Sequence, residues 1–314
     1  MGPLLFLCYV NDMVLSIDDD CKLILYADDS TILFTHKDPD FISAKLGNVL
    51  ESCSEWLVDN KLSLHLGKTE CMLFGPKRKL SKQDNFEVTC NGHIIKGTNL
   101  VKYLGLYIDS HLSGETVFNN IISKVNAKLK FLYRQSRHLD FKTKQLLCSA
   151  LIQCHFDYSC SSWYESLTKH MKRKLQITQN KVVRFILNYK PRTSVTVKDF
   201  ENMRWLNVEN RVKQLRLNHM YKIYYKKGPP YLGTNFVCSS DVRSYNTRSS
   251  NYNFIVPQCN SIMKQTFLYN GTKDWNDIPD SIKSMNDFAK YKKAVKMYLI
   301  SSSIKQIDDI YMYY

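Results

Sequence analysis

Residues 23–34 have the sequence Leu23-Ile24-Leu25-Tyr26-Ala27-Asp28-Asp29-Ser30-Thr31-Ile32-Leu33-Phe34. The large and β-branched residues on both sides of Asp28-Asp29-Ser30 predict two strands joined by a turn over those three residues, that is, a buried β-hairpin with two acids at its tip. Adjacent carboxylates on a hydrophobic hairpin repel each other unless a cation neutralises them, and Mg²⁺ is the usual candidate because it takes oxygen ligands. The alternative is an ordinary solvated turn. The apolar runs favour the metal site, since buried strands rarely carry paired acids.

Composition and charge limit the classes of function. The chain has 314 residues, is 44% hydrophobic and 23% charged, and carries a formal net charge of +15. These values indicate a globular protein with a polyanionic partner, meaning nucleic acid or an acidic membrane face, and no apolar run is long enough to span a bilayer. The 10 cysteines are scattered, which predicts reduced thiols in an intracellular protein. The spacing of Cys148, Cys154, His155 and Cys160 matches no zinc pattern and favours structural thiols.

Tyr26-Ala27-Asp28-Asp29 with its apolar flanks resembles the catalytic hairpin of reverse transcriptases, most closely those of jockey-type non-LTR retrotransposons. Residues 2–12 resemble a Gly-Pro-Leu-Leu-Phe…Tyr-x-Asn-Asp segment that lies well inside the polymerase domain of that family, although a first buried helix would also explain them. The resemblance implies that the fingers and the strand with the first catalytic aspartate are absent from this chain. The run Asp18-Asp19-Asp20 is expected to be a solvated turn at the far end of the first strand, and replacement of that aspartate by one of these acids is the less favoured alternative.

Two further segments resemble parts of the same palm. Alternation of Leu62, Leu64 and Leu66 predicts a half-buried strand. The family's Asn-Lys-Leu-x-Leu-Asn-x-x-Lys-Thr segment matches there, except that His65 replaces an asparagine, and Lys68 matches a lysine proposed to protonate the leaving pyrophosphate. A solvated surface lysine is the alternative. Residues 102–109 are predicted to form one strand that resembles the primer grip, in which Leu104 and Gly105 would hold the primer end. A β-bulge at the glycine is the competing interpretation.

Helical periodicity and turn signals outline the remaining chain. An apolar stripe predicts a helix over residues 41–62 on the back of the hairpin, and Asn91-Gly92 predicts a hairpin between residues 86–90 and 93–96. From about Glu115 the chain is expected to be helical, with stripes over 117–132, 146–156 and 171–186. The last stripe lies beside a basic face typical of a helix that contacts phosphates, as the family's thumb does. The predicted nucleic-acid contacts are Lys172, Arg173, Lys174 and Lys181, and for any single lysine the alternative is a solvated face.

The C-terminal part is predicted to contain a helix over residues 204–225, an ordered segment over 267–299 and a frayed tail over 301–314. Its order of Tyr245-Asn246-Thr247-Arg248 and then Trp275-Asn276-x-Ile278-Pro279 is common at the end of jockey-type polymerases. The predicted fold class is therefore α+β. It comprises a partial palm of antiparallel hairpins with a packing helix over 1–110, an α-helical thumb over 111–190 and a mixed C-terminal extension over 191–314.

The resemblance implies two-metal nucleotidyl transfer in the parent polymerase. Asp28 would be the main ligand of Mg²⁺, with Mn²⁺ as the alternative ion, and Asp29 would assist. Tyr26 and Ala27 would shape the floor near the primer end. The implied partners are an RNA template with a DNA primer and deoxynucleotides, in the nucleus, with no membrane and no stable protein partner. We expect this chain to be inactive alone. The other hypotheses are a basic nucleic-acid-binding remnant without catalysis and a helical interaction module, which the charge disfavours.

Overall fold

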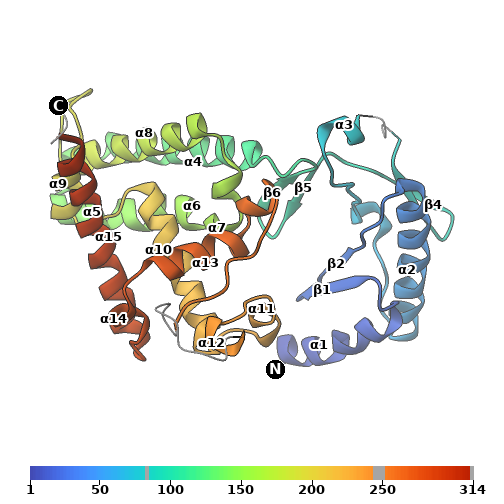
Figure 1. The fold of residues 1–314 in the computed structure, drawn as a ribbon. Coiled ribbons are helices and arrows are strands. Elements are labelled where there is room, and N and C mark those ends of the chain that lie inside the picture. Colours follow the sequence, from blue (N-terminus) through green and yellow to red (C-terminus); the bar gives the residue numbers. More distant parts are fainter. Residues whose placement is uncertain (82–84, 243–251, 312–314) are drawn as a thin grey trace. The chain divides into compact units, whose positions relative to one another are not determined.

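A computed structural model describes residues 1–81, 85–242 and 252–311. It confirms the α+β class, because helices dominate and the described strands form three separate two-stranded antiparallel hairpins. The chain divides into two compact units, Met1–Leu112 and Ser113–Tyr314, coloured blue to teal and green to red in Figure 1. The first unit contains all six named strands. The second is helical apart from one isolated bridge between Cys238 and Phe254.

The first unit is built around the predicted hairpin and the predicted amphipathic helix. Strand β1 (Lys22–Tyr26) pairs antiparallel with β2 (Asp29–Leu33), and α2 (Pro39–Asp59) follows. The helix begins after Asp38, whose carboxylate accepts a hydrogen bond from the backbone N–H of Asp40. Proline at the first helical position supports the same start. Between helix and hairpin lies a small core of Met13, Cys21, Val49 and Cys53, against which pack Leu23, Leu25, Ile32 and Phe34.

A second hairpin, β3 (Glu87–Cys90) with β4 (His93–Lys96), confirms the turn predicted at Asn91-Gly92. Both turn residues have positive φ, 49° and 76°, as a two-residue turn of this type requires. The hairpin lies close against α2, because a Cβ built on Gly47 would stand 2.6 Å from the carbonyl oxygen of Thr89.

Two strand predictions in this unit are wrong. Residues 102–109 do not form one strand: β5 (Leu100–Tyr103) turns at Leu104-Gly105 and returns as β6 (Leu106–Asp109). Residues 62–66 alternate in burial as predicted, but they form no strand pairing and lead into the short 3-10 helix η2 (Leu66–Lys68). The alternation reports which side chains face the core, whereas a strand also needs a hydrogen-bonded partner.

The chain begins with α1 (Gly2–Val10), which continues into the 3-10 helix η1 (Asn11–Ser16). The alternative of a buried first helix is wrong, because Val10 is the only residue of α1 that is buried, and Leu4 and Leu5 are 65% and 63% exposed. A short helix, α3 (Lys77–Leu80), completes the first unit.

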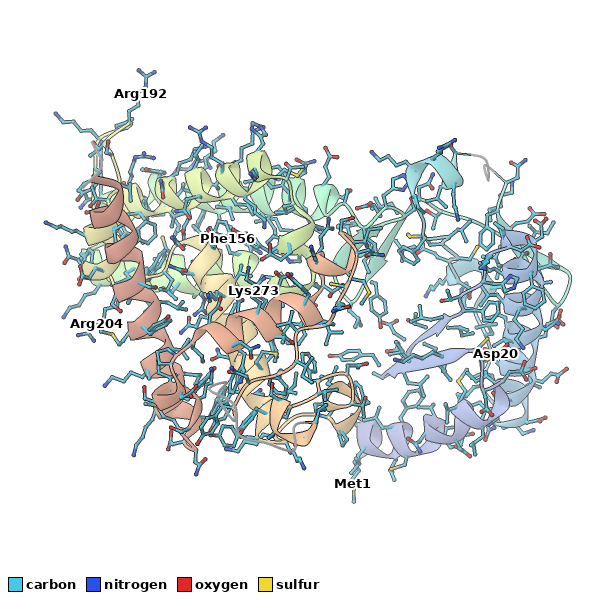
Figure 2. The ribbon with its side chains drawn as sticks, in the orientation of Figure 1. Met1, Asp20, Phe156, Arg192, Arg204 and Lys273 are labelled. Atoms are coloured by element: carbon cyan, nitrogen blue, oxygen red, sulfur yellow. The ribbon has the colours of Figure 1, made fainter. Side chains whose placement is uncertain are left out.

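The second unit opens with the helices predicted for the thumb. The stripes over 117–132 and 171–186 are confirmed as α4 (Glu115–Arg134) and α8 (Lys169–Ile186), which pack on each other. The middle stripe is wrong in detail, since Leu146 is 70% exposed. The buried residues are Lys144, Cys148, Ile152 and Phe156, every fourth position, and Figure 2 labels Phe156. A π-helical turn, η4 (Ser149–Gln153), lies between α5 (Phe141–Cys148) and α6 (Cys154–Asp157) and keeps this spacing on one side.

The C-terminal helices form a second core around Trp275, Tyr221 and Tyr291. The helix predicted over 204–225 is α10 (Val208–Tyr224), and the predicted frayed tail is wrong up to Tyr311, where the last helix ends. The Tyr245-Asn246-Thr247-Arg248 segment lies outside the described residues. The remaining elements of the unit are η3 (Ser136–His138), α7 (Cys160–Trp163), η5 (Tyr164–Ser166), α9 (Val197–Asn202), α11 (Pro230–Gly233), α12 (Ser239–Val242), η6 (Met263–Gln265), α13 (Phe267–Asp277), α14 (Asp280–Lys283) and α15 (Phe288–Tyr311).

Ion pairs join segments on either side of the predicted boundary at residue 190. Arg216 of α10 donates through Nε to Asp274 Oδ2 of α13 at 2.7 Å and through a second nitrogen to Glu165 of η5. Glu165 also accepts from Lys172 of α8. Burial raises the pKa of Asp274 despite the two cations beside it. For Glu165 the effect of burial is outweighed by hydrogen bonds from Lys172 and Arg216, so its pKa is lowered. The boundary itself stays a prediction.

Candidate functional site

The hairpin tip is tighter than the sequence predicted. Tyr26 pairs with Asp29, so the turn consists of Ala27 and Asp28, and Asp29 and Ser30 already belong to β2. Ala27 has φ 54°, a left-handed conformation that is costly for a residue with a Cβ. The prediction of a turn over Asp28-Asp29-Ser30 is therefore wrong: the observed turn begins one residue earlier and ends two residues earlier. The cause is that β-pairing of Asp29 and Ser30 satisfies their backbone groups, whereas composition alone suggested a turn.

The sequence predicted a buried hairpin, but only one face of the hairpin is buried. Leu23, Leu25 and Ile32 pack on the small core, while on the other face Tyr26 is 63% exposed and Leu33 43%. Asp28 and Asp29 are both exposed. Alternation along the strands explains this division, because successive side chains point to opposite faces and only one face has a helix behind it. The two carboxylates are thus presented to solvent on a rigid support.

No third acid of the described chain joins the tip. Lys45 of α2 pairs with Asp18 at 2.6 Å and with Asp20 at 3.1 Å, just before β1 begins. From there to the tip the strand rises by roughly 13 Å, at about 3.3 Å per residue. These acids therefore lie at the opposite end of the hairpin, as predicted.

The residues at the tip fit one part of a magnesium site. Carboxylate oxygens are the ligands Mg²⁺ prefers, and one or two of them together with substrate phosphates commonly suffice. Within the described residues, however, no group of three or more histidine, cysteine, aspartate or glutamate side chains is placed to hold a metal. Asp28 and Asp29 would therefore supply two carboxylates to such a site, and its other ligands would have to come from elsewhere than the described residues.

The other predicted palm residues lie on surface turns of the first unit. Lys68 is exposed at the end of η2. Leu104 and Gly105 form the two-residue turn between β5 and β6, with φ 46° and 80°. Gly105 is therefore needed for a turn with positive φ, and not for a bulge within a strand. A turn of this kind brings backbone groups to the surface, where another molecule can reach them.

The basic face predicted on α8 is present for three of its four residues. The 18 residues of this helix include six lysines and arginines and no acid, and Arg173, Lys174 and Lys181 are exposed. Lys172 is placed differently, because its ammonium group pairs with Glu165 and lies 4.5 Å from the centre of the Tyr164 ring. This lysine holds the helix to η5, and its charge is already balanced within the unit.

Sequence reasoning missed a second set of cations on α4. Lys124 and Lys128 are exposed one turn apart, beside His155 of α6. Burial and then these two lysines lower the pKa of His155, which shows that the three groups share one electropositive environment. Spacing of four residues on an amphipathic helix was the available signal.

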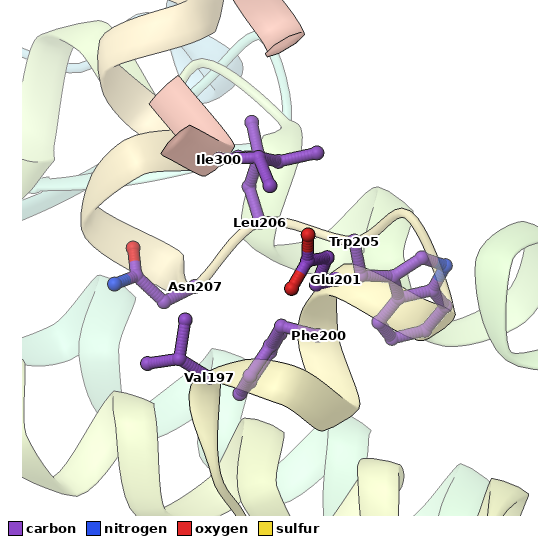
Figure 3. A pocket seen from close by; sticks show the side chains of 7 residues that line it. All are labelled: Val197, Phe200, Glu201, Trp205, Leu206, Asn207 and Ile300. Atoms are coloured by element: carbon purple, nitrogen blue, oxygen red, sulfur yellow. The ribbon is translucent and has the colours of Figure 1, made fainter. Parts of the chain in front are cut away.

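A shallow notch lies between α9 and Ile300 of α15 in the second unit (Figure 3). Its lining is mostly apolar and includes one carboxylate and no cation, so it offers nothing for a phosphate. The lining residues are Val197, Phe200, Glu201, Trp205, Leu206, Asn207 and Ile300.

Among the cysteines, Cys148 and Cys160 are buried, and burial raises the pKa of each thiol to about 12. Such thiols are poor nucleophiles and poor ligands at neutral pH.

The region that contains the hairpin tip also has a recognised family pattern. Residues 1–108 match the family model "Reverse transcriptase (RNA-dependent DNA polymerase)". The match covers about a third of the chain and includes the Tyr26-Ala27-Asp28-Asp29 tip, Lys68 and the Leu104-Gly105 turn. It ends inside β6 and includes no helix of the second unit. No curated protein and no solved structure matches the chain. Among the described helices, none has the length and apolar character needed to cross a membrane.

Proposed function

We propose that the chain is the C-terminal part of an RNA-directed DNA polymerase from a jockey-type non-LTR retrotransposon, acting on nucleic acid in the nucleus. The observation that carries the proposal is the tip of the first hairpin. Two exposed carboxylates lie at this tip, Asp28 on the two-residue turn and Asp29 as the first residue of β2, within the segment that matches the reverse transcriptase model. The charge of +15 supports a nucleic-acid partner.

In the intact parent, Asp28 and Asp29 hold Mg²⁺, or Mn²⁺ as the alternative ion. When bound, the ion would neutralise the negative charge that develops on the phosphate group being transferred. Tyr26 and Ala27 lie directly before the acids and form the surface on which the primer end rests. Leu104 and Gly105 contact the primer through their turn, and Lys68 donates a proton to the leaving pyrophosphate. All of these side chains or turns are accessible in the first unit.

The second unit holds the template–primer duplex, with the segment up to residue 190 as thumb and residues 191–314 as its extension. Arg173, Lys174 and Lys181 of α8 contact phosphates. Lys124 and Lys128 of α4 add to the same field. Lys172 does not contact phosphates and instead holds α8 in place through its ion pair with Glu165.

The chain is inactive alone, because two carboxylates are an incomplete donor set for two-metal nucleotidyl transfer. The test is extension of a DNA primer on an RNA template by the purified chain with Mg²⁺ and deoxynucleotides. We expect no extension. Extension that disappears in an Asp28→Ala variant, and persists in the control Asp19→Ala, would contradict this part of the proposal. Asp19 is a suitable control because it is exposed and forms no ion pair with a residue that the structure describes.

A second candidate is a basic nucleic-acid-binding protein without any catalytic role for the tip. It is favoured by the pairing of Asp18 and Asp20 with Lys45, which leaves the tip without a third acid. Supplying the N-terminal polymerase half as a separate chain distinguishes the two. The first proposal expects extension that depends on Asp28, and the second expects binding without extension in every combination.

A further inference from the structure

The C-terminal helices carry a second set of cations that the proposed thumb contact does not use. Lys222 and Lys227 lie on the last turn of α10 and just beyond it, and Lys292 and Lys293 lie on the first turns of α15. All four are exposed. We call these four residues the lysine patch. Figure 1 shows the end of α10 and the start of α15 at one end of the second unit, with α4 and α8 at the other.

Three lysines of the patch lie around one pair of aromatic rings, and Lys293 follows Lys292 on the same helix. Two ammonium groups lie near the Phe288 ring, with Lys222 Nζ 5.6 Å and Lys292 Nζ 4.8 Å from its centre. Lys227 Nζ lies 5.2 Å from the centre of the Tyr221 ring, which stacks on Phe288. It donates to the carbonyl oxygen of Asn286 at 3.1 Å. One aromatic stack therefore holds three positive charges close together.

The patch has more lysines than acidic partners. Among the described residues, none of the four lysines forms an ion pair with a carboxylate, whereas Lys213 and Lys283 of the same unit do. The nearest acid in the sequence, Asp287, accepts a hydrogen bond from the backbone N–H of Lys290 at the start of α15, and its charge also acts on Lys227, which helps to lower the pKa of Asp287. Lys292 and Lys293 also lie near the positive end of the α15 dipole, where cations are unfavourable. One carboxylate does not balance four ammonium groups, and a bound polyanion relieves the remaining repulsion.

We infer that the lysine patch is a second contact for the phosphate backbone of RNA or DNA, separate from α4 and α8. This inference rests on the proposed function, because the reverse transcriptase segment of the same chain makes nucleic acid the expected polyanion. The Phe288 ring beside the lysines is partly exposed, which suits a nucleic-acid strand, since cations and an accessible ring together bind backbone and bases. A chain with two separated contacts grips a longer stretch of nucleic acid than the thumb helices alone.

The test measures how binding of a 40-nucleotide RNA, and of the same sequence as DNA, to the full chain depends on salt. The patch variant is Lys222→Gln, Lys292→Gln and Lys293→Gln, which spares the hydrogen bond of Lys227. The matched control removes three exposed lysines of the first unit, Lys37→Gln, Lys61→Gln and Lys96→Gln, so that net charge falls equally. The thumb variant is Arg173→Gln, Lys174→Gln and Lys181→Gln. Circular dichroism and thermal unfolding verify that each variant folds.

Each lost phosphate contact lowers the slope of log K against log salt by about 0.7 to 1. We therefore expect the magnitude of this slope to be smaller than that of the wild type by about 2 to 3 for the patch variant and by less than about 1 for the control. A patch variant that behaves like the control, while the thumb variant loses slope, overturns the inference and leaves the proposed function standing. Loss of binding to phosphatidylserine vesicles with RNA binding unchanged also overturns it, by making the patch a membrane contact. A wild-type chain that binds no nucleic acid overturns both.

Discussion

Replacement of Arg216 by methionine should destabilise the second unit strongly. The Arg216 side chain is 6% exposed and bonds two carboxylates, Asp274 and Glu165, which are 12% and 19% exposed. Methionine fills much of the same space but leaves both acids without their shared cation. Removing one partner of a buried ion pair typically costs about 3 to 5 kcal/mol. Lys213 and Lys172 still reach the two acids, so we expect the lower end, about 3 kcal/mol.

The loss should also depend on pH in a defined direction. Without Arg216, both carboxylates lose an attractive charge, and the pKa of each rises in the folded state. The folded variant then binds more protons than the folded wild type at mildly acidic pH. The difference in unfolding free energy between wild type and variant therefore shrinks as pH falls from 7 toward 5.

Urea unfolding followed by tryptophan fluorescence measures both effects. Trp163, Trp205 and Trp275 all lie in the second unit, so the signal reports mainly on it. Lys273→Met is the control, because Lys273 is exposed next to Asp274 (Figure 2) and should change stability by less than about 0.5 kcal/mol. A loss below about 1 kcal/mol for Arg216→Met would refute the reasoning on burial. An equal loss at pH 5 and pH 7 would refute the electrostatic part.

Two further predictions concern the first unit. In an NMR titration, Mn²⁺ at millimolar concentration should broaden the amide signals around Asp28 and Asp29. The double variant Asp28→Asn/Asp29→Asn should abolish this broadening, and the control variant Asp19→Asn should not. Gly47→Ala should destabilise the first unit in thermal unfolding by about 1 to 3 kcal/mol, because the new Cβ meets the Thr89 carbonyl oxygen at 2.6 Å. Gly2→Ala, where nothing lies within 4 Å, should be neutral or stabilising, and equal effects at both glycines would contradict the packing argument.

The elements that the sequence predicted best are those in which burial and periodicity coincide. Helices α2, α4 and α8 have one face against a core, so the spacing of apolar residues reports the helix directly. The turn at Asn91-Gly92 was predictable because both residue types tolerate positive φ.

The elements that failed depend on features that periodicity does not contain. Leucine at positive φ is unusual, so the sequence of residues 102–109 did not predict a two-residue turn at Leu104-Gly105, and the glycine suggested at most a bulge. A π-helical turn adds a residue to one turn of a helix, and the predicted stripe therefore placed Leu146 inside when it lies outside. The basic face of α8 was predictable, but the inward role of Lys172 was not, because its partner Glu165 belongs to another element.

The exposure of the hairpin tip changes what the paired acids mean. Two unit charges 4 Å apart interact by about 4 kcal/mol at an effective dielectric of 20, but by about 1 kcal/mol in water. The prediction of a metal from charge repulsion assumed a buried hairpin, whereas Asp28 and Asp29 are in contact with solvent. Repulsion alone therefore does not demand a cation here. The assignment rests instead on the Tyr-Ala-Asp-Asp pattern in its two-residue turn, inside the segment that matches reverse transcriptases. It follows that the tip of this chain should bind metal weakly, and that tight binding requires ligands from a substrate or from the rest of the parent polymerase.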